Sequence, residues 1–173
     1  MRKVSVKHNA QILIGDYQFA EMIKGELLSL IRTTSPYANP IPTVVTGWNW
    51  EPNNDKFNNL KDCIKNAVET TFKPGLRVDG GMAPLVCEDF WANIYEKGDH
   101  IEPHNHRPSA YSFVYFVKAK WYHAPFVFTD SGKRIRPKEG RWVAFPSYLD
   151  HHVLKHRYKD TRITVSGNFR ILQ

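Results

Sequence analysis

From Pro84 onward the sequence consists of short runs of β-branched and aromatic residues separated by glycine, proline and aspartate. Runs of this kind at even spacing predict short antiparallel strands that form a sandwich or a jelly-roll barrel. The predicted strands span residues 86–95, 100–106, 112–118, 125–129, 141–145 and 161–171. We therefore expect a mainly β fold, a double-stranded β-helix (jelly-roll) over about residues 84–173.

Two amphipathic helices are predicted before these strands, as a helical N-terminal support over about residues 16–73. Asp16 is the predicted N-cap of the first helix, which Ser35 and Pro36 end. The second has an apolar stripe over residues 57–72, with Pro74 beyond its end. Residues 38–54, rich in proline, asparagine, threonine and tryptophan, predict an ordered loop. The helices are expected to buttress one face of the β structure.

The composition favours one domain over residues 1–173, because 173 residues with 42% hydrophobic content suffice for one buried core. Cys63 and Cys87 are isolated within apolar periodic segments, which favours buried free thiols and a reducing compartment. The N-terminus lacks the pattern of a signal peptide, and no apolar run approaches the roughly 18 residues of a membrane span. We expect a cytoplasmic protein that does not enter a membrane.

The formal net charge of +7 is concentrated near the C-terminus, since residues 132–173 contain ten Lys and Arg against three Asp and Glu. Such a segment has two interpretations: a surface that attracts nucleic acid, or a solvated face near a pocket for an anionic substrate. The RNP, zinc-finger and basic-helix signatures are missing, which favours the solvated face. The sequence predicts no oligomeric state.

Three histidines are the candidate metal ligands. His104 and His106 are two positions apart in a predicted strand, so their imidazoles point to the same face. His151 comes from a later segment and is expected to complete the group, whereas the adjacent His152 points to the opposite face. Turn glycines at Gly98 and Gly140 precede the two ligand segments. This pattern predicts a metal site.

A cationic residue follows the histidines. Residues 161–166 alternate strictly, which places Arg162, Thr164 and Ser166 on one face of a strand and Ile163 and Val165 on the other. An inward arginine beside a metal indicates a ligand with a carboxylate.

Together these residues resemble the small 2-oxoglutarate and Fe(II)-dependent oxygenases of bacteria and their phages, over roughly residues 47–169. The resemblance rests on the segments 47–48, 91–98, 104–106, 112–116, 139–147, 151–153 and 162–168. Its most specific part is His151, ten intervening residues and Arg162, at the spacing of the distal metal ligand and the cosubstrate arginine. The usual Arg-x-Ser appears here as Arg162-Ile163-Thr164, which keeps the hydroxyl.

One departure concerns the metal ligands. Most of the superfamily has His-x-Asp or His-x-Glu where this chain has His104-Asn105-His106, so three imidazoles would replace two histidines and a carboxylate. A neutral third ligand favours the 2-oxoglutarate dianion and weakens the hold on the metal. Asp99 or Glu102 is the alternative source of a carboxylate.

The resemblance implies a hydroxylase that uses Fe(II), 2-oxoglutarate and O₂ on a protein side chain, nucleotide or small metabolite. It implies Fe(II) on His104, His106 and His151, and the distal carboxylate of 2-oxoglutarate on Arg162 and Thr164. Tyr95, Tyr111 and Tyr115 are candidates for shaping the cosubstrate pocket, or are plain core. Trp48 and Trp50 are either core anchors, which we favour, or a substrate lid.

Two alternatives share the predicted fold. The spacing of the histidines and glycines also fits a cupin-like metal enzyme that does not use 2-oxoglutarate, although Arg162 favours the oxygenase. The third possibility is a non-enzymatic jelly-roll binding module whose histidines hold structural zinc or no metal.

Overall fold

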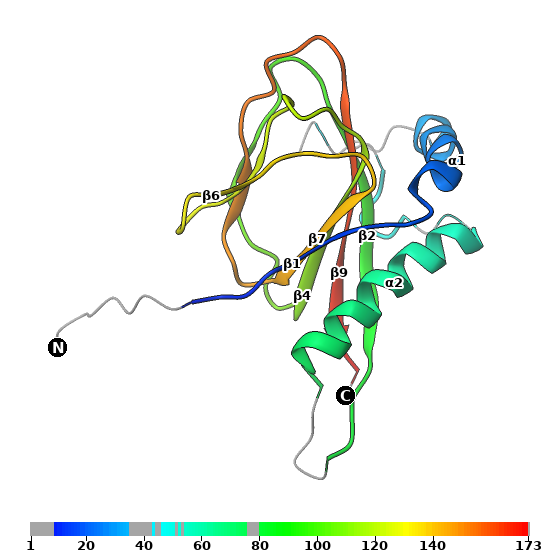
Figure 1. Cartoon of the computed structure of the whole chain (residues 1–173), viewed down its shortest axis with the longest axis vertical. Coiled ribbons are helices and arrows are strands. Elements are labelled where there is room, and N and C mark those ends of the chain that lie inside the picture. The colour runs from blue at the N-terminus through cyan, green and yellow to red at the C-terminus, as the bar shows by residue number, and fades with distance from the viewer. Residues whose placement is uncertain are drawn as a thin grey trace, which may run out of the picture.

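Two antiparallel sheets form the body of the protein (Figure 1). The computed structural model describes residues 9–34, 43, 46–50, 52, 54–75 and 80–172. The larger sheet has the order β1 (Leu13–Asp16), β7 (Arg141–Pro146), β4 (Tyr111–Lys118), β9 (Arg162–Ile171) and β2 (Leu85–Tyr95). The smaller sheet has the order β3 (Ile101–His104), β8 (His151–Val153), β5 (Phe126–Phe128) and β6 (Lys133–Ile135). Non-sequential neighbours in both sheets are typical of a jelly-roll, which confirms the predicted fold class.

Both helices lie on the outer side of the larger sheet, away from the smaller one (Figure 1). Helix α1 spans Ala20–Thr33 and buries Ile23, Leu27 and Ile31. Helix α2 spans Asp55–Phe72, and the side chain of Asn54 caps it by accepting a hydrogen bond from the backbone N–H of Lys56 at 2.9 Å. The helices therefore bury the face of the sheet that points away from the barrel.

The larger sheet consequently has two buried faces. Alternate residues such as Ile163 and Val165 pack in the core beneath the helices. Side chains on the opposite face of the sheet, such as Val114 and Phe116 of β4, pack in the barrel interior between the two sheets. The inward side chains at the start of β9, Arg162 and Thr164, therefore lie between the sheets and are fully buried.

The start of the first helix was predicted wrongly. Asp16 is the last residue of β1, and Phe19 occupies the N-cap position of α1 without a side-chain hydrogen bond. The reason is tertiary: β1 pairs with β7, and Asp16 forms ion pairs with Lys138 at 2.6 Å and Arg141 at 3.4 Å. Ser35 and Pro36, the predicted end of this helix, lie outside the described residues, and Thr34 is its C-cap.

Cys63 and Cys87 are not joined in a disulfide, as expected, but they are not buried: Cys63 lies on the exposed side of α2, and Cys87 is half-buried in β2. Gly98 and Gly140 have φ values of 110° and 78°, which suits the tight turns predicted there. No helix in the described parts of the chain is both long and apolar enough to cross a membrane.

Candidate metal and cosubstrate site

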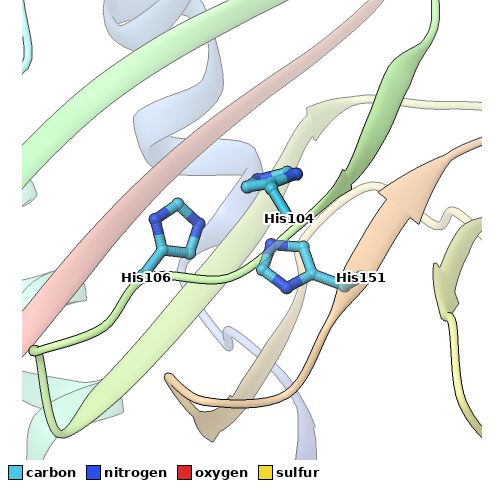
Figure 2. A group of neighbouring side chains, drawn as sticks. All are labelled: His104, His106 and His151. Atoms are coloured by element: carbon cyan, nitrogen blue, oxygen red, sulfur yellow. The ribbon is translucent and has the colours of Figure 1, made fainter.

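Three imidazoles converge between the two sheets (Figure 2). His104 ends β3 and His151 begins β8, and the two residues are directly opposite each other in the sheet. The ring centroids of His104 and His151 are 4.4 Å apart, and His106 lies 5.0 Å from each. One ring nitrogen from each histidine lies within 4.8 Å of the others, and the group contains no carboxylate. Such a triangle suits a single transition-metal ion.

The two carboxylates considered as alternatives point elsewhere. The Asp99 side chain accepts a hydrogen bond from the backbone N–H of Glu96 at 2.7 Å, and Glu102 lies 2.9 Å from the exposed ring of His100. Neither belongs to the histidine group. The described residues therefore offer a set of three neutral nitrogen ligands.

Backbone carbonyls orient two of these rings. The Nδ1 atom of His104 lies 2.8 Å from the carbonyl oxygen of Glu102, and Nδ1 of His151 lies 2.9 Å from that of Leu149. A carbonyl only accepts hydrogen bonds, so both histidines carry their proton on Nδ1 and leave the Nε2 lone pair available. Hydrogen bonds of this kind commonly fix the tautomer and direction of metal-binding histidines.

His106 is held differently, because it lies beyond the end of β3. Its backbone N–H donates to the carbonyl oxygen of Ser147 at 2.9 Å. The Ser147 hydroxyl lies 2.7 Å from that of Ser112, which in turn donates to Asn168 Oδ1 at 2.7 Å. Ser112 and Ser147 are fully buried, so this network fixes the turn that carries His106.

Burial keeps two of the three imidazoles in their neutral form. It lowers the pKa of His106 to about 4, and the neighbouring His104 adds to the effect. Burial also lowers the pKa of His151 to about 3, with a further contribution from His104. Both imidazoles are thus deprotonated near pH 7, as metal binding requires.

The metal-free protein is expected to lose stability as the pH falls from about 7 to about 5. In the unfolded chain these histidines take up protons near their ordinary pKa of 6.5, whereas the folded pKa of His151 is about 3. The contribution of these neutral histidines to the free energy of unfolding is therefore complete above pH 6.5 and declines below it. For His151 the decline is about 2 kcal/mol at pH 5. Urea unfolding with a chelator present measures the loss. His151→Leu should flatten this profile, and an unchanged profile would contradict the assignment.

A hydrogen bond on the outer side joins the two ligand segments. Asn105, between His104 and His106, donates from Nδ2 to Oδ1 of Asp150 at 2.7 Å, and Asp150 directly precedes His151. This contact ties the end of β3 to the start of β8.

Asp150→Ala is expected to weaken Fe(II) binding by about 10-fold, the lower end of the range for residues that support metal ligands. The reason is that the two ligand segments lose their link. Asp150→Asn keeps an oxygen that can accept from Asn105, so it should retain most of the affinity and separates the hydrogen bond from the charge. Anaerobic Fe(II) titration measures both variants. Equal losses in the two would assign the effect to charge alone.

Arg162 is the largest fully buried side chain among the described residues, at 0% exposure. Its Nε and both terminal nitrogens have no hydrogen-bond partner among the described residues. The guanidinium lies over the rings of Tyr95 at 4.5 Å and Phe116 at 5.2 Å, and burial lowers its pKa. A buried cation without an anionic partner costs several kcal/mol, so this arrangement indicates a missing anionic ligand.

A row of inward side chains connects Arg162 with the histidines. Across the β2–β9 pairing, Arg162 is opposite Tyr95, Thr164 is opposite Asn93, and Ser166 is opposite Trp91. The Trp91 ring is 5.4 Å from that of His106. The row therefore leads from Arg162 along the inward face of the sheet toward His106.

The middle of this row is polar and buried. Asn93 is 2% exposed and Thr164 is 0% exposed. The Asn93 amide donates to the hydroxyls of Thr164 and Ser166, each at 3.5 Å, while its Oδ1 has no partner among the described residues. Sequence reasoning gave Asn93 no role, although the alternation of Trp91, Asn93 and Tyr95 along β2 placed it on the inward face.

The other predicted residues divide between the two faces of the larger sheet. Tyr95 lies beside Arg162. Burial raises the pKa of the Tyr95 hydroxyl, and its hydrogen bond with the Thr164 side chain partly opposes this rise. Tyr115 and Tyr111 lie in the helix-side core, where Tyr115 contacts Tyr17 at 6.3 Å and Tyr111 stacks on Phe72 at 5.3 Å. Their placement does not support a role in the cosubstrate pocket.

The two loop tryptophans also separate. Trp50 stacks on Phe90 at 5.7 Å and packs with the helix-side core, as expected for an anchor. Trp48 instead contacts Trp91 at 4.7 Å, next to His106. Backbone hydrogen bonds between Phe90 and both Trp48 and Trp50 hold this loop against β2. Trp48 therefore belongs to the surroundings of the metal centre.

Neither a scan of protein-family models nor a search of curated proteins finds a match to this chain. Among solved structures, the viral collagen prolyl hydroxylase of Paramecium bursaria Chlorella virus-1, in its complex with 2-oxoglutarate, aligns with a TM-score of 0.71 at 12% identity, over 94% of this chain and 96% of the other. A prolyl-4-hydroxylase of Pseudomonas putida aligns with a TM-score of 0.67 at 17% identity, over 94% and 93%.

A third similar structure is HygX of Streptomyces hygroscopicus with nickel and 2-oxoglutarate bound, with a TM-score of 0.70 at 9% identity, over 94% of this chain and 83% of the other. At such identities the likeness establishes the fold, which is the double-stranded β-helix of 2-oxoglutarate and Fe(II)-dependent oxygenases. Function must be argued from the site itself.

Proposed function

We propose that this chain is a single-domain Fe(II)- and 2-oxoglutarate-dependent oxygenase of the hydroxylase type. The observation on which the proposal rests is Arg162, a fully buried guanidinium whose three nitrogens lack partners among the described residues, in the same barrel as three convergent imidazoles. The fold shared with solved oxygenases supports it.

His104, His106 and His151 would hold the iron. Imidazole is a suitable ligand for Fe(II), and three nitrogens from one side leave further coordination positions for other ligands. Closed structural zinc sites need a fourth protein ligand, and the histidine group contains none. The donor set therefore fits a site that exchanges ligands better than a structural one.

Arg162 and Thr164 would hold the cosubstrate. The guanidinium has donors in a planar fork that matches a carboxylate, and the Thr164 hydroxyl lies next along the same inward face. Arg162 would hold the distal carboxylate of 2-oxoglutarate, and the histidine-bound iron would take its keto acid end. Three neutral ligands leave the iron with its full charge, which suits a dianion.

When bound together, iron, 2-oxoglutarate and O₂ supply oxidative decarboxylation to succinate and carbon dioxide, coupled to transfer of one oxygen atom into a C–H bond of the primary substrate. The chain's own part is to position and to exclude water. Phe126 and Phe145 pack against the His151 ring at 5.0 Å and 4.8 Å, which shields one side of the centre from solvent. We place the primary substrate beside His106, against Trp91 and Trp48.

A cupin-like metal enzyme remains the second candidate, and it has no use for Arg162. The distinguishing experiment measures binding of two keto acids to the anaerobic Fe(II)-loaded protein by calorimetry. One is 2-oxoglutarate, and the other is 2-oxovalerate, in which a methyl group replaces the distal carboxylate.

We expect 2-oxoglutarate to bind at least about 30-fold more tightly than 2-oxovalerate, as follows from a pair worth about 2 kcal/mol or more. Arg162→Ala should remove this difference and leave 2-oxovalerate binding unchanged. Arg170→Ala, at an exposed position of the same strand, is the matched control and should behave as wild type. Unchanged 2-oxoglutarate binding in Arg162→Ala would contradict the oxygenase and favour the cupin.

A further inference from the structure

Two loops beyond the strand ends bring exposed aromatic side chains together. Trp121, in the loop after β4, is 73% exposed, and Tyr158, in the loop after β8, is 42% exposed. The Tyr122 ring lies between them, 5.7 Å from Trp121 and 4.5 Å from Tyr158. Large aromatic rings left this exposed are uncommon, and grouped ones indicate a binding surface.

Hydrogen bonds hold this aromatic group in place. The Asp160 carboxylate accepts from the Tyr122 hydroxyl at 3.0 Å and lies 3.1 Å from Nε2 of His123, which is 2% exposed. The Lys120 ammonium lies 3.0 Å from the same carboxylate. Lys120 and His123 hold the pKa of Asp160 below its usual range. The negative charge of Asp160 is thus compensated within the protein, and the rings above it are preorganised.

Exposed cations flank Tyr158 along the second loop. Lys155, Arg157 and Lys159 alternate with His156 and Tyr158 along the second loop, and all three are exposed. Among the described residues none of the three forms an ion pair, unlike Lys120 with Asp160. These cations belong to the basic segment 132–173, and their charges are directed outward. The surface therefore combines exposed aromatic faces with uncompensated positive charge.

We propose that this aromatic–basic surface, formed by Trp121, Tyr122, Tyr158, Lys155, Arg157 and Lys159, binds single-stranded nucleic acid. Unpaired bases stack on aromatic side chains, and basic side chains neutralise the phosphates. Both requirements are met side by side here. The positive charge favours a polyanion as the ligand. The exposed aromatic faces favour a polyanion whose own rings are free to stack on them. Stacking tolerates every base, so the binding should show little sequence preference.

This surface is separate from the metal centre. His151 begins β8, whereas Lys155 follows its other end, and Trp121 follows the far end of β4. The proposal does not depend on the oxygenase activity. Substitutions on the surface are expected to leave Fe(II) binding unchanged, which also serves as a check that the variants fold.

The experiment is fluorescence anisotropy of a labelled oligothymidylate, and of a duplex of equal length, titrated with the full chain over a range of salt concentrations. Trp121→Ala should weaken single-strand binding by about 5- to 160-fold, the range for one lost stacking contact of about 1–3 kcal/mol. The double variant Lys155→Glu, Arg157→Glu should also weaken single-strand binding. The slope of the logarithm of the binding constant against the logarithm of the salt concentration should become less steep by at least about 0.7 per residue changed. The single strand should bind more tightly than the duplex.

Two matched controls separate the surface from general basicity. Lys133→Glu with Arg134→Glu makes the same charge change at two exposed positions of β6, which are paired with Phe128 and Val127 of β5. Met22→Ala removes an apolar side chain that is 65% exposed on α1. Both should bind the single strand much as wild type does. Equal losses in the two charge variants, no effect of Trp121→Ala, or equal binding of the duplex would each overturn the proposal.

Discussion

Arg162→Met is expected to stabilise the ligand-free protein while abolishing its binding of 2-oxoglutarate. The guanidinium is fully buried, and its three nitrogens lack partners among the described residues. Replacing a buried charge by an apolar side chain of similar size removes that cost, by about 1–4 kcal/mol in comparable cases. Methionine also packs well in an irregular gap against Tyr95 and Phe116. The free energy of unfolding should therefore rise.

Denaturant unfolding with and without Fe(II) and 2-oxoglutarate measures both effects at once. Wild type should gain stability from the ligands through mass action, whereas Arg162→Met should gain nothing from 2-oxoglutarate. Arg170→Met, on the exposed part of β9, is the control and should leave both quantities near wild type. A destabilised Arg162→Met protein would show that the guanidinium has partners in the ligand-free state, contrary to this account.

His151→Leu is expected to reduce Fe(II) affinity by at least about 100-fold, since residues that merely support a ligand already account for 10- to 100-fold. Leucine preserves apolar packing against Phe126 and Phe145, which contact the His151 ring at 5.0 Å and 4.8 Å. The loss should therefore reflect the missing nitrogen and not a collapsed core. Anaerobic titration with Fe(II), followed by metal analysis after desalting, gives the affinity and the stoichiometry.

His152→Leu is the matched control for this prediction. His152 is the next residue of β8 and points to the opposite face, where its Nδ1 lies 2.9 Å from the Thr129 hydroxyl. Its substitution should leave Fe(II) binding unchanged. If His152→Leu lost the metal and His151→Leu kept it, the assignment of ligands along β8 would be reversed.

The inward residues of β9 could be predicted because the side-chain period of a strand is two. Arg162 and Thr164 share one face and Ile163 and Val165 the other, as the alternation indicated, and the two sets lie in different cores. The six predicted strands all exist with small shifts of their ends, and α2 lies where its apolar stripe placed it. Local periodicity therefore defined most of the fold.

Tyr115 shows where this reasoning fails. Its neighbours Val114 and Phe116 point into the barrel, whereas Tyr115 packs beneath the helices. Both faces of β4 are buried, so the strand reads as a continuous apolar run without alternation of polarity. Hydrophobicity alone cannot then distinguish the face toward the cosubstrate from the face toward the helices.

Long-range contacts account for the other differences. β3 ends at His104, so His106 does not owe its direction to strand alternation; the carbonyl of Ser147, distant in sequence, holds it in place. The short strand β6 was not predicted, because three residues give too little periodicity and its pairing with β5 defines it. The three predicted histidines nevertheless lie close together, because their spacing along the chain is itself a local signal.

The central claim is that one chain binds Fe(II) on three histidines and 2-oxoglutarate on Arg162 in the same barrel. Anaerobic titration of the metal-free protein with Fe(II) and 2-oxoglutarate tests it directly, through the weak visible charge-transfer band of the iron chelate. The account predicts the band in wild type, Arg170→Met and His152→Leu, and its loss in Arg162→Met and His151→Leu. One Fe(II) bound per wild-type chain without any band on addition of 2-oxoglutarate would contradict it.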